Sequence, residues 1–87
     1  MSYRLKVLAR AKRSLATIWL AAADRNAVAR ANDRLERRLQ NDPLTVGESR
    51  GGRIRVAVFD PLVAFYTVDP ADRKVVILDI RSFLSRP

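Results

Sequence analysis

The spacing of apolar residues changes twice along this chain, and that change constrains its fold more than any other feature. Residues 3–7 alternate apolar and charged side chains, which is the period of a half-buried strand. Residues 8–22 then repeat apolar side chains every three or four positions, as in an amphipathic helix. A second helix is predicted from an N-cap at Asp24 to about Asn41, because Pro43 disfavours helix at the residue before it. Alternation returns after a polar loop.

Three more strands are predicted at residues 53–59, 63–68 and 75–80, separated by two turns that contain Asp and Pro. Their short connections indicate an antiparallel meander. A helical hairpin on one face of that meander gives an α+β domain with the order β-α-α-β-β-β. The first strand must also join the sheet, but the sequence leaves its pairing partner open; beside the last strand it would run either parallel or antiparallel to it. The last strand is apolar enough to be central and buried on both faces.

The hairpin must bury its apolar face against the sheet. Four helix residues are expected to face the strands: Leu15, Ile18, Leu35 and Leu39. Their expected partners on the sheet are Ile54, Val56, Val58 and Ile80. Trp19 continues the apolar face of the first helix, and Tyr66 lies in a strand rich in β-formers, so both are expected in the core.

The length of the chain, 87 residues, fits one domain, and we assign residues 1–87 to it. Cysteine and histidine are absent, which removes disulfides, the usual zinc and iron–sulfur ligands, and nucleophilic triads built on those residues. The acids are few and scattered, so no metal or cofactor is predicted. The apolar run at residues 15–23 is shorter than the roughly 20 residues that span a bilayer. We expect a cytoplasmic protein that does not bind membranes.

The net charge is +8, and most of it lies in the first half of the chain. Residues 1–40 hold ten Lys and Arg against three Asp and Glu, which leaves +7 there and +1 in the remainder. Such an imbalance favours anionic partners such as nucleic acid or an acidic protein. The alternative interpretation is that arginine serves here as an ordinary solvated surface charge.

Several short segments, spread in a particular order and spacing over nearly the whole chain, are informative when taken together. In the helices they are Ala9–Leu15, Ile18-Trp19, Leu35 and Leu39; then come Asp42-Pro43 and Gly47; in the strands they are Arg53–Val56, Ala64–Val68 and Val76–Arg81. This arrangement resembles the RelE/ParE superfamily, the toxins of type II toxin–antitoxin systems, which include plasmid stabilization proteins. The resemblance implies a toxin that a cognate acidic antitoxin holds inactive, in a complex of higher order.

The resemblance also implies which residues act on the target. RelE-like members cut mRNA on the ribosome with basic residues before and on the second strand, an Arg on the third strand, and an Arg and a Tyr near the C-terminus. Four arginines match target-binding positions: Arg50, Arg53, Arg55 and Arg81. The last three would be catalytic if the chain is a ribonuclease, since cations must stabilise the charge that develops on the phosphate. Val63 occupies the third-strand position, and the C-terminal Tyr is absent, with Phe83 the nearest aromatic.

The sequence therefore leaves the enzymatic activity and the target open. ParE-like members inhibit DNA gyrase without known cleavage chemistry, so both translation and gyrase are candidate targets. Two further classes remain: an inactive relative that serves as a binding module or co-repressor with its antitoxin, and a basic nucleic-acid-binding domain. Since Arg53 and Arg55 are two positions apart on a strand, they should share a sheet face and form an anion-binding surface with Arg81. The Arg50–Arg53 segment could instead cradle phosphate, but a strand-leading loop is the simpler interpretation.

Overall fold

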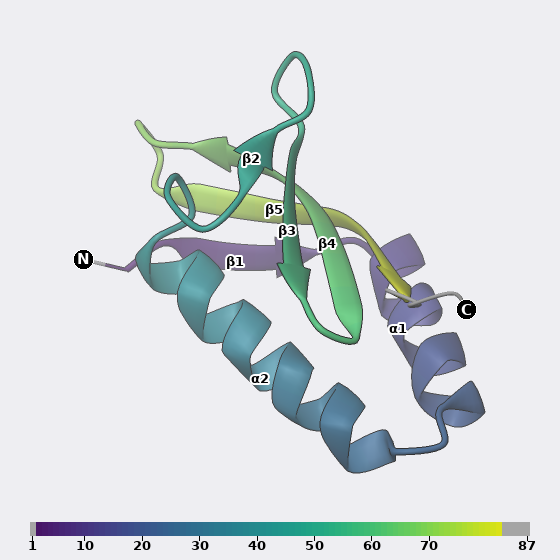
Figure 1. Cartoon of the computed structure of the whole chain (residues 1–87). Coiled ribbons are helices and arrows are strands. Elements are labelled where there is room, and N and C mark those ends of the chain that lie inside the picture. The colour runs from purple at the N-terminus through teal and green to yellow at the C-terminus, as the bar shows by residue number, and fades with distance from the viewer. Residues whose placement is uncertain (1, 83–87) are drawn as a thin grey trace.

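A computed structural model describes residues 2–82 of the chain (Figure 1). Two helices and five strands follow in the order β1 (Arg4–Val7), α1 (Ala9–Ala21), α2 (Arg25–Asn41), β2 (Glu48–Ser49), β3 (Arg55–Phe59), β4 (Leu62–Asp69) and β5 (Lys74–Ser82). The predicted α+β class and the predicted order of the main elements are confirmed. The two-residue strand β2 was not predicted, because it lies in the polar loop that carries no apolar alternation.

The strands form one sheet in the order β1-β5-β4-β3-β2. β3, β4 and β5 make the predicted antiparallel meander, and β2 pairs antiparallel with β3. β1 pairs with β5 in parallel, which settles the orientation that the sequence left open. Parallel neighbours need a long connection, and here the helical hairpin and strands β2–β4 lie between β1 and β5 in the sequence. β1 ends opposite Ile77, so within residues 2–82 the C-terminal half of β5 has no strand beside it on that edge and packs along α1 instead.

Local contacts explain where the helices begin and end. The Asp24 carboxylate accepts a hydrogen bond of 3.0 Å from the backbone N–H of Ala27, which confirms the predicted N-cap of α2. Arg25 donates to the carbonyls of Trp19 and Leu20 in the last turn of α1, where carbonyls run out of regular helical donors; the Trp19 carbonyl also accepts from the Ala22 N–H. Its positive charge also suits the C-terminal end of that helix. One arginine thus joins the end of α1 to the start of α2.

The core lies between the helices and one face of the sheet. From α2 it contains Val28, Ala31, Leu35 and Leu39, and from the strands Ala57, Phe59, Leu62, Ala64, Tyr66, Val75, Ile77 and Ile80. The predicted positions of Leu35, Leu39 and Ile80 are confirmed. Leu15 and Ile18 are partly buried and pack against this cluster, because α1 lies over the edge of β5 rather than over the middle of the sheet.

Three residues predicted to face the core from the second predicted strand do not do so, because the opposite face of β3 turns inward. Ile54 precedes the strand and is 42% exposed, Val58 is 54% exposed, and Val56 is half-buried. Ala57 and Phe59 face the core in their place. Residues 56–59 are all apolar, so alternation could not show which face turns inward; pairing of Ala57 with Ala64 on β4 decides it.

Two further predictions of burial need correction. Trp19 is 40% exposed on the outer side of α1, because the wide apolar face of that helix extends beyond the part that the sheet covers. β5 is central, but only one of its faces is fully buried, at Val75, Ile77 and Ile80. Between residues 2 and 82 no helix has the length and apolar character needed to cross a membrane.

Candidate functional site

Arg55 lies beneath the loop between α2 and β3 and acts as an internal link. Its Nη2 atom donates to the carbonyl oxygens of Leu44 at 2.8 Å and Gly47 at 2.7 Å. Its Nε atom is buried and has no hydrogen-bond partner within residues 2–82. Arg55 pairs with Tyr66, which pairs with Ile77, and both partners are fully buried, so Arg55 belongs to the core face of the sheet. The Nη2 group of Arg55 is therefore engaged by the loop.

Tyr66 fixes the other side of the same loop. It is fully buried, and its hydroxyl donates to the carbonyl oxygen of Pro43 at 2.8 Å. Gly47 passes so close that a Cβ atom there would overlap the Tyr66 hydroxyl and would lie 2.8 Å from the carbonyl oxygen of Val56. The expected core role of Tyr66 is confirmed. Its hydroxyl is committed to the backbone and is not available to activate a 2′-hydroxyl.

Arg50 and Arg53 are exposed on the turn that connects β2 to β3. The turn is closed by hydrogen bonds between the Arg50 N–H and the Ile54 carbonyl and between the Ile54 N–H and the Gly51 carbonyl. Gly51 and Gly52 both have positive φ angles, 118° and 57°, which favour glycine. This segment is a hairpin turn whose Arg50 and Ile54 N–H groups are occupied. Beside it lies a hollow of about 440 Å³, lined in part by Arg53, Arg55 and Asp69.

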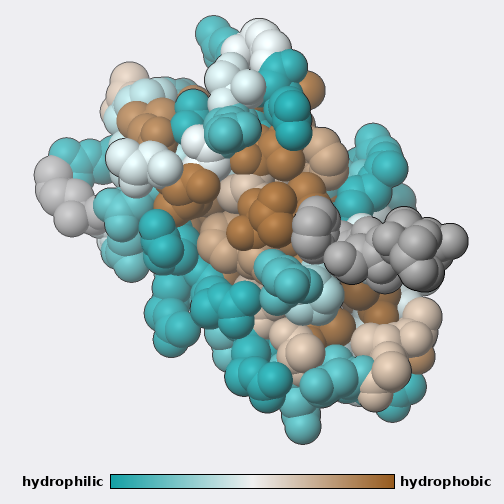
Figure 2. All heavy atoms as spheres, in the orientation of Figure 1, coloured by the Kyte–Doolittle hydropathy of each residue, from teal (hydrophilic) through white to brown (hydrophobic). Residues whose placement is uncertain are grey.

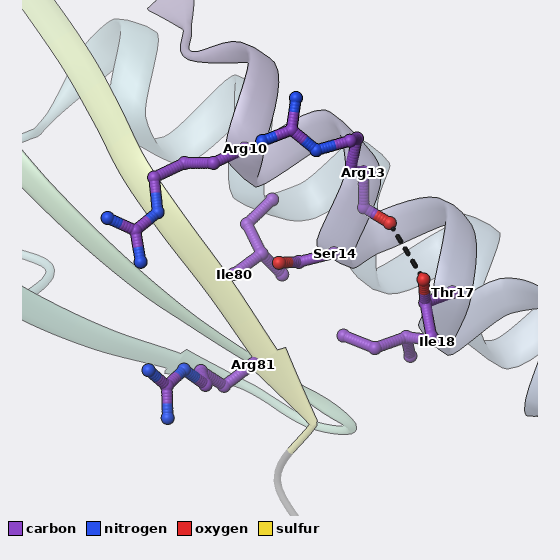
Figure 3. Close-up of a pocket in the computed structure, with 7 residues that line it drawn as sticks. All are labelled: Arg10, Arg13, Ser14, Thr17, Ile18, Ile80 and Arg81. Atoms are coloured by element: carbon purple, nitrogen blue, oxygen red, sulfur yellow. Dashed lines mark hydrogen bonds between the residues drawn. The ribbon is translucent and has the colours of Figure 1, made fainter.

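Arg81 lies in a different hollow, between α1 and the C-terminal half of β5 (Figure 3). This hollow has a volume of about 760 Å³, and its lining residues are Arg10, Arg13, Ser14, Thr17, Ile18, Ile80 and Arg81. Figure 3 shows Arg10 from α1 and Arg81 from β5 extending to the same side of β5. We call this region the α1–β5 basin. Three arginines from two rigid elements line this one hollow, an arrangement that can bind an anionic group.

Asp79 holds two of the basin arginines together. One of its carboxylate oxygens, Oδ2, lies 3.1 Å from Nε of Arg81 and 3.9 Å from Nη2 of Arg10. The other oxygen accepts from the Ser14 hydroxyl at 3.0 Å and from the Ile80 backbone N–H at 2.9 Å. Partial burial alone would raise the pKa of Asp79, but hydrogen bonds from Arg81, Ser14 and Ile80 outweigh it and lower that pKa below its usual 3.8. The carboxylate is therefore ionised at neutral pH.

The predicted single surface of Arg53, Arg55 and Arg81 is not formed. Arg81 pairs with Val63, which pairs with the exposed Val58, whereas Arg55 lies on the opposite face with Tyr66. The structure instead joins Arg81 to Arg10 and Arg13, which the sequence analysis did not select. A signal was present, because Arg10, Arg13 and Thr17 recur at helical spacing on one polar face. Phe83, the aromatic residue nearest to the missing tyrosine position, lies outside the described residues.

Figure 2 shows hydrophobic side chains gathered over the middle of the face that carries β3 and β4, bordered by hydrophilic side chains. Ile54 and Val58 are large apolar residues of this part of the chain that remain exposed, and Leu44 in the preceding loop is 47% exposed. An apolar area with a hydrophilic border suits a protein partner. No group of acidic residues within residues 2–82 is arranged to hold a metal ion.

Comparison with known proteins bears on the fold. No protein-family model matches the chain, and no curated protein matches it. Among solved structures, the RelBE2 toxin–antitoxin complex of Mycobacterium tuberculosis matches 94% of this chain and 99% of its own, with a TM-score of 0.79 and 20% identity.

Two further structures agree. The RelE–RelB complex of Pyrococcus horikoshii matches 99% of this chain and 100% of its own, with a TM-score of 0.69 and 16% identity. The chromosomal ParDE system of Pseudomonas aeruginosa matches 95% of this chain and 98% of its own, with a TM-score of 0.69 and 20% identity. The chain has the fold of the RelE/ParE toxins over nearly its whole length.

Proposed function

We propose that this protein is the toxin of a type II toxin–antitoxin pair and that it inhibits growth by binding its target. The α1–β5 basin carries the proposal, because it holds three arginines on a fold shared with solved toxin–antitoxin complexes. The chain's +8 charge adds long-range attraction toward an anionic target. The cytoplasm is the proposed site of action, since translation and DNA gyrase are both there.

The arrangement of arginines favours inhibition by binding over cleavage of mRNA. RNA cleavage without histidine requires several cations and a base at one phosphate. Within residues 2–82, Arg55 is bound to loop carbonyls, Arg81 lies on the opposite face of the sheet, and the Tyr66 hydroxyl is buried. These positions do not converge on one phosphate. We therefore infer the ParE-like mode, with DNA gyrase as the target.

The proposed antitoxin is an acidic chain that folds over the toxin surface. A domain with this net charge attracts an acidic segment, and the exposed apolar residues Leu44, Ile54 and Val58 give such a segment something to cover. Complex formation should weaken as the salt concentration rises, because the Debye length falls from about 10 Å at 0.1 M to about 3 Å at 1 M. Assembly with the antitoxin into a complex of higher order is part of the same proposal.

Regulated expression tests the function directly. We expect growth to stop when the chain is expressed alone and to continue when the adjacent reading frame is expressed with it. The Arg10→Ala/Arg81→Ala double variant should lose growth inhibition, whereas Arg30→Ala, at an exposed position on α2 away from the basin, should keep it. Unhindered growth during strong expression of the folded wild-type chain would overturn the toxin proposal.

A second measurement tests the mode of action. We expect intact transcripts by primer extension, together with accumulation of DNA breaks in the expressing cells. Codon-phased cuts in mRNA would overturn the binding mode and would assign the basin to a ribonuclease. Inhibition that is unchanged in the Arg10→Ala/Arg81→Ala variant would remove the basin from the target surface while leaving the toxin proposal intact.

A further inference from the structure

The side of α2 that lies toward the end of β3 carries three arginines that the proposed function does not use. Arg34, Arg37 and Arg38 line a hollow of about 210 Å³ together with Phe59, the last residue of β3. The three arginines are exposed, whereas Phe59 belongs to the core. We call this region the α2–β3 hollow. Figure 2 shows hydrophilic side chains along α2, on the same view of the molecule as Figure 1.

No acidic side chain neutralises these arginines. Within residues 2–82, none of the ion pairs of the chain involves them. The two acids of α2 are placed elsewhere, since Asp33 lines the groove beside α1 and Glu36 accepts from Asn32. Arginines that lie three and four residues apart on a helix repel each other. An anion bound among them would relieve that repulsion, so the hollow is suited to an anionic ligand.

One of the three arginines is already held in place. The Nη2 atom of Arg34 donates to the carbonyl oxygen of Asp60, between β3 and β4, at 3.2 Å. This hydrogen bond links α2 to the end of β3. A guanidinium has five N–H donors, so Arg34 keeps donors for a ligand after making this contact. Guanidinium groups bind phosphate oxygens in pairs, and a phosphate is therefore the anion that this hollow fits.

The lining of the hollow also indicates which phosphate-bearing molecule it can bind. A protein partner would find little apolar surface to cover, because Phe59 is only 8% exposed. The same burial leaves no aromatic ring in the lining on which a single-stranded base could stack. Arginine has no acceptor for the 2′-hydroxyl that distinguishes RNA. We propose that the α2–β3 hollow binds the phosphate backbone of duplex DNA, without regard to base sequence.

Binding of this kind would hold the chain on DNA through charge alone. The hollow is a separate site from the α1–β5 basin, because the two share no lining residue. The proposal does not rest on the proposed toxin function, and it would apply whether or not DNA gyrase is the target. Its role would be to raise the local concentration of the protein along DNA.

The salt dependence of binding gives the number of phosphates that the hollow neutralises. Each neutralised phosphate contributes a slope of about −0.9 to the plot of log affinity against log salt concentration. Three arginines should therefore give a slope of about −2.7, or an affinity that falls about 40-fold between about 0.05 and about 0.2 M salt. We expect a dissociation constant of roughly 10–100 µM at about 0.1 M salt, as for sequence-independent binding.

Fluorescence anisotropy of a labelled duplex of about 20 base pairs measures both quantities. The full-length chain is made by cell-free synthesis and titrated to about 200 µM at several salt concentrations. We expect a second duplex of unrelated sequence to bind with the same affinity to within about twofold, because only phosphates are contacted. Single-stranded DNA and duplex RNA of the same length should bind more weakly than duplex DNA.

Substitution of one arginine separates a phosphate contact from general attraction by the net charge. Arg37→Ala should reduce the salt slope by about 1 and the affinity about eightfold at about 0.1 M salt. Arg30→Ala is the matched control, since Arg30 is exposed on the same helix but does not line the hollow. It removes the same charge and should leave the slope unchanged. Circular dichroism checks that both variants are folded.

Several outcomes would overturn the proposal. Constant anisotropy up to about 200 µM protein at about 0.05 M salt would show that the hollow is only a solvated surface. Equal losses of slope in Arg30→Ala and Arg37→Ala would show a diffuse charge effect with no site. A slope that falls in the Arg10→Ala/Arg81→Ala variant and not in Arg37→Ala would assign the DNA contact to the α1–β5 basin.

Two further outcomes would reject duplex DNA as the ligand. Tighter binding of duplex RNA or of single-stranded DNA would do so directly. If Arg37→Ala keeps its DNA affinity but loses binding to an acidic protein, the hollow belongs to that protein. All of these measurements use purified components and none records growth, so their failure leaves the toxin proposal standing, and failure of the toxin proposal leaves them interpretable.

Discussion

Arg55 and Arg81 look alike in the sequence, yet the structure uses them in opposite ways. Arg55 lies on the core face of the sheet, and its guanidinium is bonded to two loop carbonyls. Arg81 is two-thirds exposed and stands beside Arg10 over the α1–β5 basin, oriented by Asp79. A guanidinium whose Nη2 group bonds to two internal carbonyls stabilises the fold, and that nitrogen is no longer available to a ligand. One held by a single carboxylate keeps donors free for an anion.

The two regions should therefore respond differently to mutation. Around Arg55, the loop depends on packing and buried hydrogen bonds, so substitutions there should reduce stability. In the basin, the contacts are exposed or half-exposed ion pairs, so substitutions should change function with little loss of stability.

Gly47→Ala should have the largest effect, a loss of about 3 kcal/mol or more. The added Cβ would overlap the Tyr66 hydroxyl and press on the Val56 carbonyl, and neither is the flexible end of a long side chain. Gly52→Ala is the matched control: its Cβ would meet open space, and only its positive φ of 57° would cost about 1 kcal/mol. Urea unfolding followed by circular dichroism compares the two. Equal losses would show that the close approach at Gly47 can relax.

Arg55→Ala should cost about 2–3 kcal/mol, since it leaves the Leu44 and Gly47 carbonyls without their charged donor. Arg53→Ala, two positions earlier and on the exposed turn, should cost less than about 0.5 kcal/mol. The same unfolding measurement applies to both. If the two variants are equally stable, Arg55 is not an internal link and becomes a candidate target-binding residue again.

Asp79→Asn should cost about 1 kcal/mol at neutral pH, because it removes the charge that orients Arg10 and Arg81. The folded-state pKa of Asp79 is lowered, so its stabilising contribution is complete above the unfolded value of 3.8 and is lost as the pH falls through the lower folded value. Wild type and variant should therefore converge in stability once the pH lies below the lowered folded-state pKa of Asp79. A difference that persists there would mean that Asp79 acts through packing rather than charge.

Arg81→Ala should change stability least, by about 0.5 kcal/mol, because its guanidinium is two-thirds exposed and Asp79 keeps its hydrogen bonds from Ser14 and Ile80. Growth inhibition should nevertheless fall in this variant. Thermal unfolding of the variant measures the change in stability, and growth curves measure the change in growth inhibition. A folded Arg81→Ala protein with full inhibitory activity would remove the contrast between the two regions, since neither arginine would then serve the target.

The sequence determined the elements and their order, because hydrophobic period and turn chemistry are local properties. The helical face of α2 at Val28, Leu35 and Leu39 could be identified from spacing alone, as could the N-cap at Asp24. The α+β class followed from two helices placed before a meander of strands. Sequence reasoning failed where the pattern was degenerate. In β3, four consecutive apolar residues left two phases open, and the wrong one was chosen.

Only the tertiary structure decided which charged residues meet. Arg10 and Arg81 are far apart in the sequence, and they share Asp79 because β1 runs parallel to β5 and ends early, which places α1 along the edge of β5. Arg55 turned inward because pairing of Ala57 with Ala64 set the phase of β3. A residue's face depends on register, and register depends on long-range pairing that no local pattern contains. The sequence supplied the arginines, and the sheet determined which of them are free to bind.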